Sequence, residues 1–343
     1  MSSRITIKDV AKEAGVSIAT VSNVMNGTGR VSIRTVRKVE DVIERLQFYP
    51  SKAARNLKDK SSHLIAVVVP YLKEARLRDN PFYWKLMIGI EEGAKHKSFQ
   101  VMLMDVNDEE SFAFVQERHL DGLIVVGTFQ NAPVIDRILA LKKPVVFMDS
   151  YISDLSLYQV YLDDEEGGYL GAKHLLELGH RSIGVMCGLL IEGGVYHARW
   201  KGFQKAIREA GLSMDNQHIF DIHTSAEKGR RLAHQIAEEH PDITAMFSFS
   251  DIGALGLIRG FHEKGIRVPD DMSVMGFDDM YYMEYMNPAL TTIRQNVHEK
   301  GRAAVEMLME LIDDSATSAR QIVLPVELIV RESTDICKHT AQS

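Results

Sequence analysis

The chain has 343 residues, of which 45% are hydrophobic and 25% are charged, and its formal net charge is −7. This length is too great for one ordinary hydrophobic core and predicts two or three domains, and the composition is typical of a globular protein. Because the sequence has no apolar run of about 18 residues, no apolar signal core near its start, and only two distant cysteines, Cys187 and Cys337, we expect a cytoplasmic protein without a disulfide framework.

The charge is divided unevenly along the chain. Residues 1–60 contain 12 Lys and Arg against 6 Asp and Glu, a local net charge of +6, so the remaining residues carry −13. A basic head on an acidic body indicates a module that binds phosphate-rich partners. A charged, solvent-exposed face would produce a smaller imbalance of the same kind.

Two short helices joined by a tight turn are predicted near the N-terminus. The first carries an apolar stripe at three- and four-residue spacing, formed by Ile7, Val10, Ala11 and Ala14. Gly15 is expected to end it, because glycine readily adopts the left-handed conformation. Ser17 is a good N-cap for the second helix, Ile18–Asn26. Such a pair is either a DNA-binding helix-turn-helix or an ordinary helical hairpin.

A third helix and a linker follow. The helix is expected to open at Val31, with Ser32 as its cap, and to run to about Leu46, which completes a small bundle of about 48 residues. In the next stretch Pro50 interrupts any helix, and four basic residues dominate, namely Lys52, Arg55, Lys58 and Lys60. This stretch is interpreted as a linker.

From His63 onward, short apolar runs alternate with helix-like segments. The runs are Leu64–Pro70, Val101–Asp105, Gly122–Gly127, Pro144–Asp149, Ile183–Cys187, Ala245–Phe249 and Ser273–Gly276. The helical segments are Tyr83–Lys97, Glu109–His119, Pro133–Leu141, Glu165–Leu178, Tyr196–Ala210, Ala226–Glu239 and Ile252–Lys264. Short apolar runs suit parallel strands buried on both faces, and the alternation predicts two α/β lobes with doubly wound sheets.

The chain resembles the lactose-repressor/galactose-repressor (LacI/GalR) type of transcription regulators. The resemblance begins with the string D-V-A-x-x-A-G-V-S-x-x-T-V-S-x-V-x-N, from Asp9 to Asn26. It continues over nearly the whole body through a series of short matches, which include Asn80-Pro81-Phe82, Leu178-Gly179-His180, Arg199 with Gly202-Phe203, Ser250-Asp251, Gly276-Phe277-Asp278-Asp279 and Leu290-Thr291-Thr292-Ile293.

The resemblance implies a fold and its boundaries. Residues 1–48 would form the helix-turn-helix headpiece and residues 49–62 a hinge with a short helix. The body would be periplasmic-binding-protein-like, with a first α/β lobe of residues 63–161 and 293–325 and a second of residues 162–292 and 326–340. Three connections would cross between the lobes, around Leu162, Thr292 and Pro325, and a long helix, Val297–Ile312, would follow the second of them.

DNA contacts are expected on the outer side of the second helix. We expect Ile18, Ala19 and Asn23 to face bases, and Asn23 to favour adenine by its geometry. Phosphate contacts are expected from Thr6, Ser17, Thr20, Ser22 and Arg30. In the hinge, the resemblance assigns Leu57 to a wedge between base steps in the minor groove, with Ala54 and Arg55 beside it. Alternatively, Leu57 caps the junction between domains.

An effector site is expected beyond the carboxyl ends of the strands, where open α/β sheets bind ligands. Asp149, Asp251 and Asp278 follow such strands, and together with Arg199 they suit a sugar or a sugar derivative, because carboxylates accept from hydroxyls and arginine donates in a fixed fork. The resemblance assigns effector contact to Arg199 and Asp278, whereas Asp149 is either a contact or a structural cap.

Two positions near this site qualify the expectation. Ser250 stands where related regulators often carry asparagine, and the shorter side chain cannot bridge two ligand hydroxyls, which puts a simple sugar in doubt. Phe82 and Trp84 could stack on a sugar face, although Trp84 could equally pack in the core.

No catalytic or cofactor motif is present. The sequence lacks G-x-G-x-x-G, G-x-x-x-x-G-K-[ST], G-x-S-x-G and H-E-x-x-H. Its 13 histidines include no pair at metal-ligand spacing with nearby thiols, and His174 and His180 are interpreted as structural residues of a helix and its end. An α/β enzyme is therefore disfavoured, and a transporter's solute-binding protein would not need the basic head. We expect no enzymatic activity and no cofactor.

The resulting interpretation is a DNA-binding transcriptional regulator with an effector-binding body. One head covers only a half-site, so a homodimer on a pseudo-palindromic operator is expected. The effector would be a small molecule, a sugar or derivative, and repression relieved by an inducer is the expected response.

Overall fold

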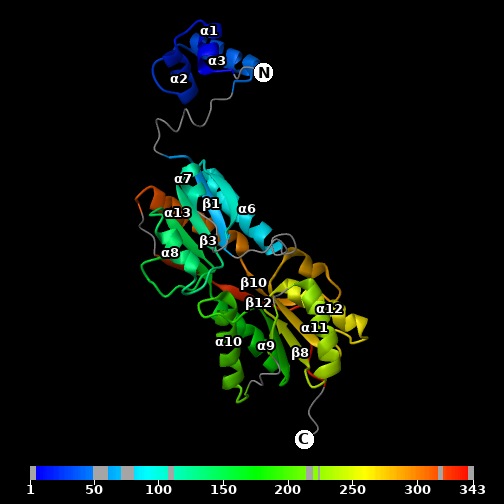
Figure 1. Cartoon of the computed structure of the whole chain (residues 1–343). Helices are drawn as coiled ribbons and strands as arrows, with labels where there is room; N and C mark the ends of the chain where they lie inside the picture. The colour runs from blue at the N-terminus through cyan, green and yellow to red at the C-terminus, as the bar shows by residue number, and fades with distance from the viewer. Residues whose placement is uncertain are drawn as a thin grey trace. The chain divides into compact units, whose positions relative to one another are not determined.

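The chain forms two compact units, residues 1–62 and 63–343 (Figure 1). The computed structural model describes residues 5–48, 61–70, 81–106, 112–213, 219–222, 225–315 and 320–338. The hinge residues Ala54, Arg55 and Leu57 lie outside this part of the chain, as do 71–80, and the wedge assigned to Leu57 is not tested by the structure.

In the first unit, the described residues 5–48 form a head of three helices. Its helices are α1 (Ile7–Ala14), α2 (Ile18–Asn26) and α3 (Ile33–Leu46). Gly15 has φ +60° and ends α1, and Ser17 and Ser32 are the N-caps of α2 and α3, as the sequence predicted. The helices close on a small apolar core formed by Val10, Ala11, Ala14, Val21, Val39, Val42 and Phe48.

The described residues of the second unit form two six-stranded sheets. The first sheet has the strand order β11-β5-β4-β3-β1-β2 and is parallel throughout. Its strands are β1 (Leu64–Pro70), β2 (Gln100–Val106), β3 (Gly122–Val126), β4 (Val145–Met148), β5 (Tyr158–Leu162) and β11 (Gln321–Leu324). Its helices are α6 (Pro81–His96), α7 (Ala113–Glu117), α8 (Pro133–Leu139) and α13 (Val297–Ile312).

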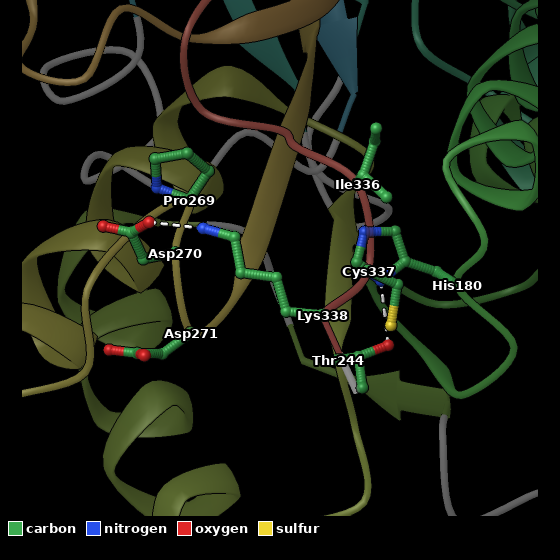
Figure 2. A pocket seen from close by; sticks show the side chains of 8 residues that line it. All are labelled: His180, Thr244, Pro269, Asp270, Asp271, Ile336, Cys337 and Lys338. Carbon is green, nitrogen blue, oxygen red and sulfur yellow. Dashed lines mark hydrogen bonds and ion pairs between the residues drawn. The ribbon is translucent and has the colours of Figure 1, made fainter. Parts of the chain in front are cut away.

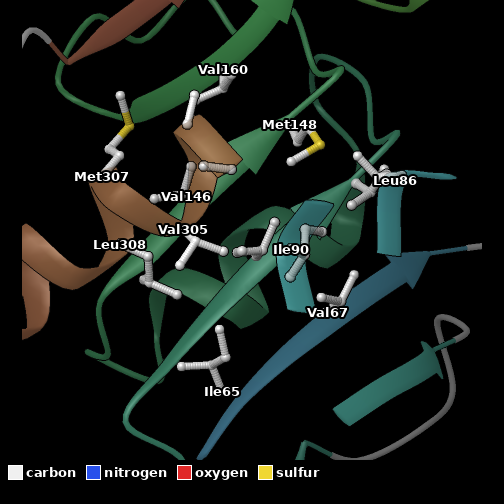
Figure 3. Close-up of a cluster of buried hydrophobic side chains, with 14 of the residues drawn as sticks. Ile65, Val67, Leu86, Ile90, Val146, Met148, Val160, Val305, Met307 and Leu308 are labelled. Atoms are coloured by element: carbon white, nitrogen blue, oxygen red, sulfur yellow. The ribbon is translucent and has the colours of Figure 1, made fainter. Parts of the chain in front are cut away.

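Helices α6 and α13 lie together on one face of this first sheet. Figure 3 shows how Leu86 and Ile90 of α6 meet Val305 and Leu308 of α13 over the strand residues Ile65, Val67, Val146, Met148 and Val160. All of these side chains are buried. The cluster therefore fixes α13 against the first sheet, although α13 follows a strand of the second sheet in sequence.

The second sheet has the strand order β12-β10-β9-β8-β6-β7. It is parallel except for β12, which runs antiparallel to β10. Its strands are β6 (Ile183–Cys187), β7 (Ile219–Asp221), β8 (Ala245–Ser248), β9 (Ser273–Asp278), β10 (Thr291–Gln295) and β12 (Val326–Ile329). Its helices are α9 (Asp164–Glu177), α10 (Val195–Glu209), α11 (Ala226–Glu239) and α12 (Asp251–Glu263). The expected class, a helical head plus an α/β body with two doubly wound sheets, is confirmed.

The chain crosses between the sheets three times. It does so after β5, after β10, and between β11 and β12 at Pro325. We expected the second crossing near Thr292, but Thr292 and Ile293 pair with Gly276 and Phe277 inside the second sheet, so the crossing follows Gln295. With the second boundary moved from Thr292 to Gln295, we keep the proposed division of the body into two lobes.

Candidate functional site

The outer side of α2 is the first candidate. Ile18, at the first turn, is 45% exposed although it is apolar, and Ala19 beside it is also exposed. Thr20, Ser22 and Asn23 are half-buried. A surface isoleucine at a capped helix start offers an apolar contact to a partner, such as a thymine methyl group in a DNA major groove.

Two residues frame this surface. The Ser17 hydroxyl accepts a hydrogen bond from the Thr20 amide at 3.1 Å and so fixes the first turn. Gly29 has φ +81°, which favours glycine, and a Cβ there would lie 2.9 Å from Nδ2 of Asn23, so a larger residue would also displace the Asn23 side chain. Arg30 is exposed one residue later.

Thr6 lies at the start of α1. Its backbone amide and hydroxyl both donate to Asp9, at 2.8 Å and 2.7 Å, which ties the first turn together. The hydrogen bonds to Thr6 lower the pKa of Asp9 below its usual value. Thr6 therefore has a structural role in the head besides the phosphate contact expected from the sequence.

The second candidate is a cluster of buried charged groups at the strand ends of the body. Asp149 follows β4 and Asp278 ends β9, and their φ angles are +50° and +132°. The φ of Asp149 lies in the left-handed region that aspartate tolerates, whereas that of Asp278 lies outside it, and such strained residues concentrate at functional sites. Both side chains are buried, as are those of Arg199 and Asp251.

Arg199, on α10, is held by three contacts. Its Nε donates to Oδ1 of Asp164 at 2.7 Å, and its Nη1 donates to the backbone oxygen of Phe249 at 2.6 Å. Its guanidinium lies 3.5 Å from the centre of the Phe277 ring. Burial alone would lower the pKa of Arg199, but the charges of Asp164 and Asp278 outweigh burial and raise it.

Asp149 is bound by Lys300 of α13. The Lys300 ammonium donates to both carboxylate oxygens, at 2.8 Å and 2.7 Å, and to Oε1 of Gln295 at 3.0 Å. The amide nitrogen of Gln295 in turn donates to Oδ1 of Asp278. The ring of Phe82, which packs against the cores of both sheets, lies 5.0 Å from the ammonium. Both carboxylate oxygens of Asp149 thus have a structural partner in Lys300, and effector contact by Asp149 stays a prediction.

Ser250 and Asp251 have structural partners. The Ser250 hydroxyl caps α12 by accepting from the Gly253 amide at 3.2 Å. Asp251 accepts from the Thr292 hydroxyl at 2.6 Å and from the Met280 amide at 2.8 Å. Burial, together with the charge of Asp278, raises the pKa of Asp251 to about 8. Burial raises that of Asp278 to about 6, against the opposing charge of Arg199.

The structure therefore brings four of the six expected effector residues into one network, namely Phe82, Asp149, Arg199 and Asp278. Three further residues of this network, Asp164, Gln295 and Lys300, were not predicted from the sequence. Lys300 was detectable, because a lone lysine interrupts the apolar stripe that Val297, Ala304 and Leu308 form along α13. Trp84 is 62% exposed, so the alternative that it packs in the core is wrong, and its stacking on a sugar stays a prediction.

A separate cavity of about 460 Å³ lies beside this network. Its lining includes Gln130, Tyr151, Tyr161, Asp163, Asp164, Glu192, His197 and Lys201. None of the six expected effector residues lines it. Tyr151 connects the two features, because its hydroxyl bonds to the Asp164 carboxylate and its backbone amide donates to the oxygen of Gly193 at 3.1 Å.

A second hollow, of about 10 Å³, is too small for more than a water molecule (Figure 2). At its wall, His180 is hydrogen-bonded to the hydroxyls of Thr244 and Ser273, at 2.9 Å and 3.0 Å. His174 is bonded to the Thr334 hydroxyl at 3.0 Å. Both histidines are structural, as expected, and burial lowers the pKa of each.

Among the described residues, no group of three or more His, Cys, Asp and Glu side chains could hold a metal ion. No helix in the same part of the chain is long and apolar enough to cross a bilayer.

Comparison with known proteins gives matches along most of the chain. Residues 6–51 match the model of bacterial regulatory proteins of the lacI family, and residues 172–334 match that of a periplasmic binding protein-like domain. The HTH-type transcriptional repressor PurR of Photobacterium profundum is 35% identical, over 96% of this chain and 98% of PurR.

Two solved structures are similar over 96% of this chain. The lac repressor dimer bound to operator and the anti-inducer ONPF is 29% identical and is covered over 99% of its length, with a TM-score of 0.84. The transcriptional regulator CelR in complex with cellobiose is 26% identical and is covered completely (100%), with a TM-score of 0.73.

Proposed function

The chain belongs to the LacI family of bacterial transcription regulators, and on that premise we propose that it is a repressor whose head binds operator DNA under the control of an effector bound by its body. The observation that supports this most is the capped helix α2, with Ile18 and Ala19 exposed at its first turn. Its relatives are transcriptional repressors rather than enzymes. The protein would act in the cytoplasm, where its operator lies.

The head would read DNA with one face of α2. Ile18, Ala19 and Asn23 face bases in this proposal, and Asn23 would take an adenine. The phosphate contacts come from Thr6, Ser17, Thr20, Ser22 and Arg30. The net charge of +6 on residues 1–60 supplies the attraction that does not depend on sequence.

The hinge would add shape readout. Leu57 would wedge between base steps in the minor groove, with Ala54 and Arg55 beside it. Two heads on one pseudo-palindromic operator require a homodimer. The similar lac repressor structure is a dimer bound to operator, which supports this assembly.

The effector would bind at the buried charged network. Asp149, Arg199 and Asp278 would contact it, Phe82 would pack on it, and Ser250 and Asp251 would shape the second sheet's side of the site. The carboxylates favour a ligand rich in hydroxyl donors, a sugar or a derivative. The cellobiose complex of CelR supports a carbohydrate. Ligand binding would shift the two lobes and thereby the spacing of the heads, which relieves repression.

A gel shift with DNA from upstream of the chain's own gene and its neighbours tests the DNA-binding part. We expect one fragment to bind selectively, with affinity that falls steeply between about 50 and about 200 mM salt. Equal affinity for all fragments would contradict it. Calorimetry with a panel of free and phosphorylated sugars then tests the effector class, and binding of none of the carbohydrates would exclude a sugar.

A further inference from the structure

Lys300 is a buried lysine whose hydrogen-bonding capacity is fully used. Its side chain is 1% exposed, on the first turn of α13. An ammonium has three donors and no acceptor. Two of the donors reach Oδ1 and Oδ2 of Asp149, and the third reaches Oε1 of Gln295. Lys300 therefore has no donor left for a ligand, and any effect on the site passes through its two partners.

The first partner, Gln295, has its orientation set by Lys300. Because the ammonium can only donate, the amide oxygen of Gln295 must face it. The amide nitrogen is thereby turned toward Asp278, where it donates to Oδ1. Gln295 ends β10 of the second sheet, whereas Asp149 follows β4 of the first. One ammonium thus orders polar groups from both sheets.

The second partner, Asp149, has its charge compensated by Lys300. Burial raises the pKa of Asp149, and the positive charge of Lys300 opposes that rise. The other groups that face this carboxyl are Asp164 of α9, which raises its pKa further, Arg199 of α10, which lowers it, and the hydroxyl of Tyr151. Arg199 is already bonded to Asp164, so among the described residues Lys300 is the cation bonded to Asp149.

We propose that Lys300 is a positioning residue of the effector site: it holds Asp149 as an ionised acceptor and turns Gln295 so that Asp278 is presented in a fixed geometry to the hydroxyl groups of a ligand. This inference rests on the proposed function, because that function assigns ligand contact to Asp149 and Asp278. The geometry favours a ligand that donates hydrogen bonds to these carboxylates, since the ammonium is already saturated.

The test compares thermal unfolding of the full chain at pH 5 and pH 8. In Lys300→Met, a side chain of similar length removes the charge and leaves Asp149 uncompensated. We expect the melting temperature to fall on the order of 10 °C at pH 8, as for a broken buried ion pair. At pH 5 the loss should be less than half as large, because the stranded carboxyl takes up a proton instead of remaining charged.

A second substitution separates charge from packing. Asn tolerates the left-handed backbone that Asp149 adopts, at φ +50°. Asp149→Asn in the Lys300→Met background should therefore restore most of the loss at pH 8. Lys264→Met is the matched control, because Lys264 is partly exposed and is paired with the exposed Glu238. That variant should lose little, and equally at both pH values.

A loss in Lys300→Met that is the same at pH 5 and pH 8, and that Asp149→Asn does not restore, would show that Lys300 only packs. This result would overturn the inference about Lys300 but would not contradict the proposed binding of operator DNA. Conversely, the gel shift of the parent chain can fail although the pH-dependent loss and its rescue are observed. The two failures are therefore distinguishable.

Discussion

The hydroxyl of Ser17 accepts a hydrogen bond from the backbone amide of Thr20 at 3.1 Å and lies 2.9 Å from the Thr20 hydroxyl. The same arrangement recurs at the start of α3, where Ser32 accepts from the Thr35 amide at 3.2 Å and the hydroxyls are 2.8 Å apart. Only the first cap begins the helix that we propose for the DNA groove. The head thus contains its own control for separating stability from recognition.

Ser17→Ala should therefore weaken both folding and DNA binding. Loss of an N-cap costs about 1 kcal/mol of stability. Ser32→Ala should lower the free energy of unfolding by a similar amount. Denaturant unfolding of the head measures both losses. In gel shifts, Ser17→Ala should lose clearly more operator affinity than Ser32→Ala, because it also removes a phosphate contact. Equal losses of affinity would remove Ser17 from the interface.

Asn23 and Arg30 should differ in how their removal affects DNA binding. Asn23→Ala is expected to cost about 1–3 kcal/mol of operator affinity and to relax the preference at one base pair. Arg30→Ala should weaken binding to all sequences alike and reduce the slope of log affinity against log salt by about one. Gel shifts on a set of single-base operator variants at several salt concentrations measure both. An unchanged base preference in Asn23→Ala would contradict the assignment.

The fold was predictable where strands are buried on both faces. Leu64–Pro70 and Ile183–Cys187 are continuous apolar runs, and both were identified with the bounds that the structure has. The strands missed are β5, β7, β10, β11 and β12. β10 reads Thr-Thr-Ile-Arg-Gln, and its polar residues have specific partners, because Thr292 bonds to Asp251 and Gln295 to Asp278. Such partners arise from tertiary structure, so they produce no hydrophobic periodicity from which this strand could be predicted.

The same limit applies to the effector site. Asp149 and Asp278 were identifiable because each follows an apolar strand, and ligands bind at such ends. Asp164 was not singled out, since its role depends on Arg199, 35 positions away. Lys300 is visible as a lone lysine in an apolar stripe, but its partner Asp149 lies 151 positions away. The sequence shows which residues end strands, whereas pairing between distant elements requires the fold.

Arg199 and Asp164 should behave as a coupled buried pair. Their side chains are 5% and 0% exposed, so Arg199→Met would leave Asp164 without its cation and should cost about 3–5 kcal/mol. Arg199→Met together with Asp164→Leu should cost less than Arg199→Met alone, because no charge is then stranded. Denaturant unfolding of the parent chain, Arg199→Met, Asp164→Leu and the double variant closes the double-mutant cycle. Additive losses would show that the pair is not coupled. A loss of effector binding in Arg199→Met should be assigned to a lost contact only after its loss of stability has been measured.

Asp251 and Asp278 should make the body less stable as the pH rises. Their pKa values, about 8 and about 6 in the folded chain, lie above the ordinary value of 3.8. Between about pH 4 and pH 8 the folded chain therefore binds more protons than the unfolded chain. The resulting stability is fully present below about pH 4 and is lost as the pH rises through 6 and then 8.

We therefore expect the melting temperature of the body to fall from pH 5.5 to pH 8.5, and to fall less in Asp278→Asn. That substitution removes one titrating carboxyl and also the charge that raises the pKa of Asp251. Glu227→Gln is the control, because hydrogen bonds from Arg230 and Arg231 lower the pKa of Glu227 to about 2, outside this range. Its pH profile above pH 5.5 should match that of the parent chain. A slope in Asp278→Asn that equals or exceeds the parent's would show that Asp278 is ionised throughout, and that Arg199 and Gln295 compensate its burial completely.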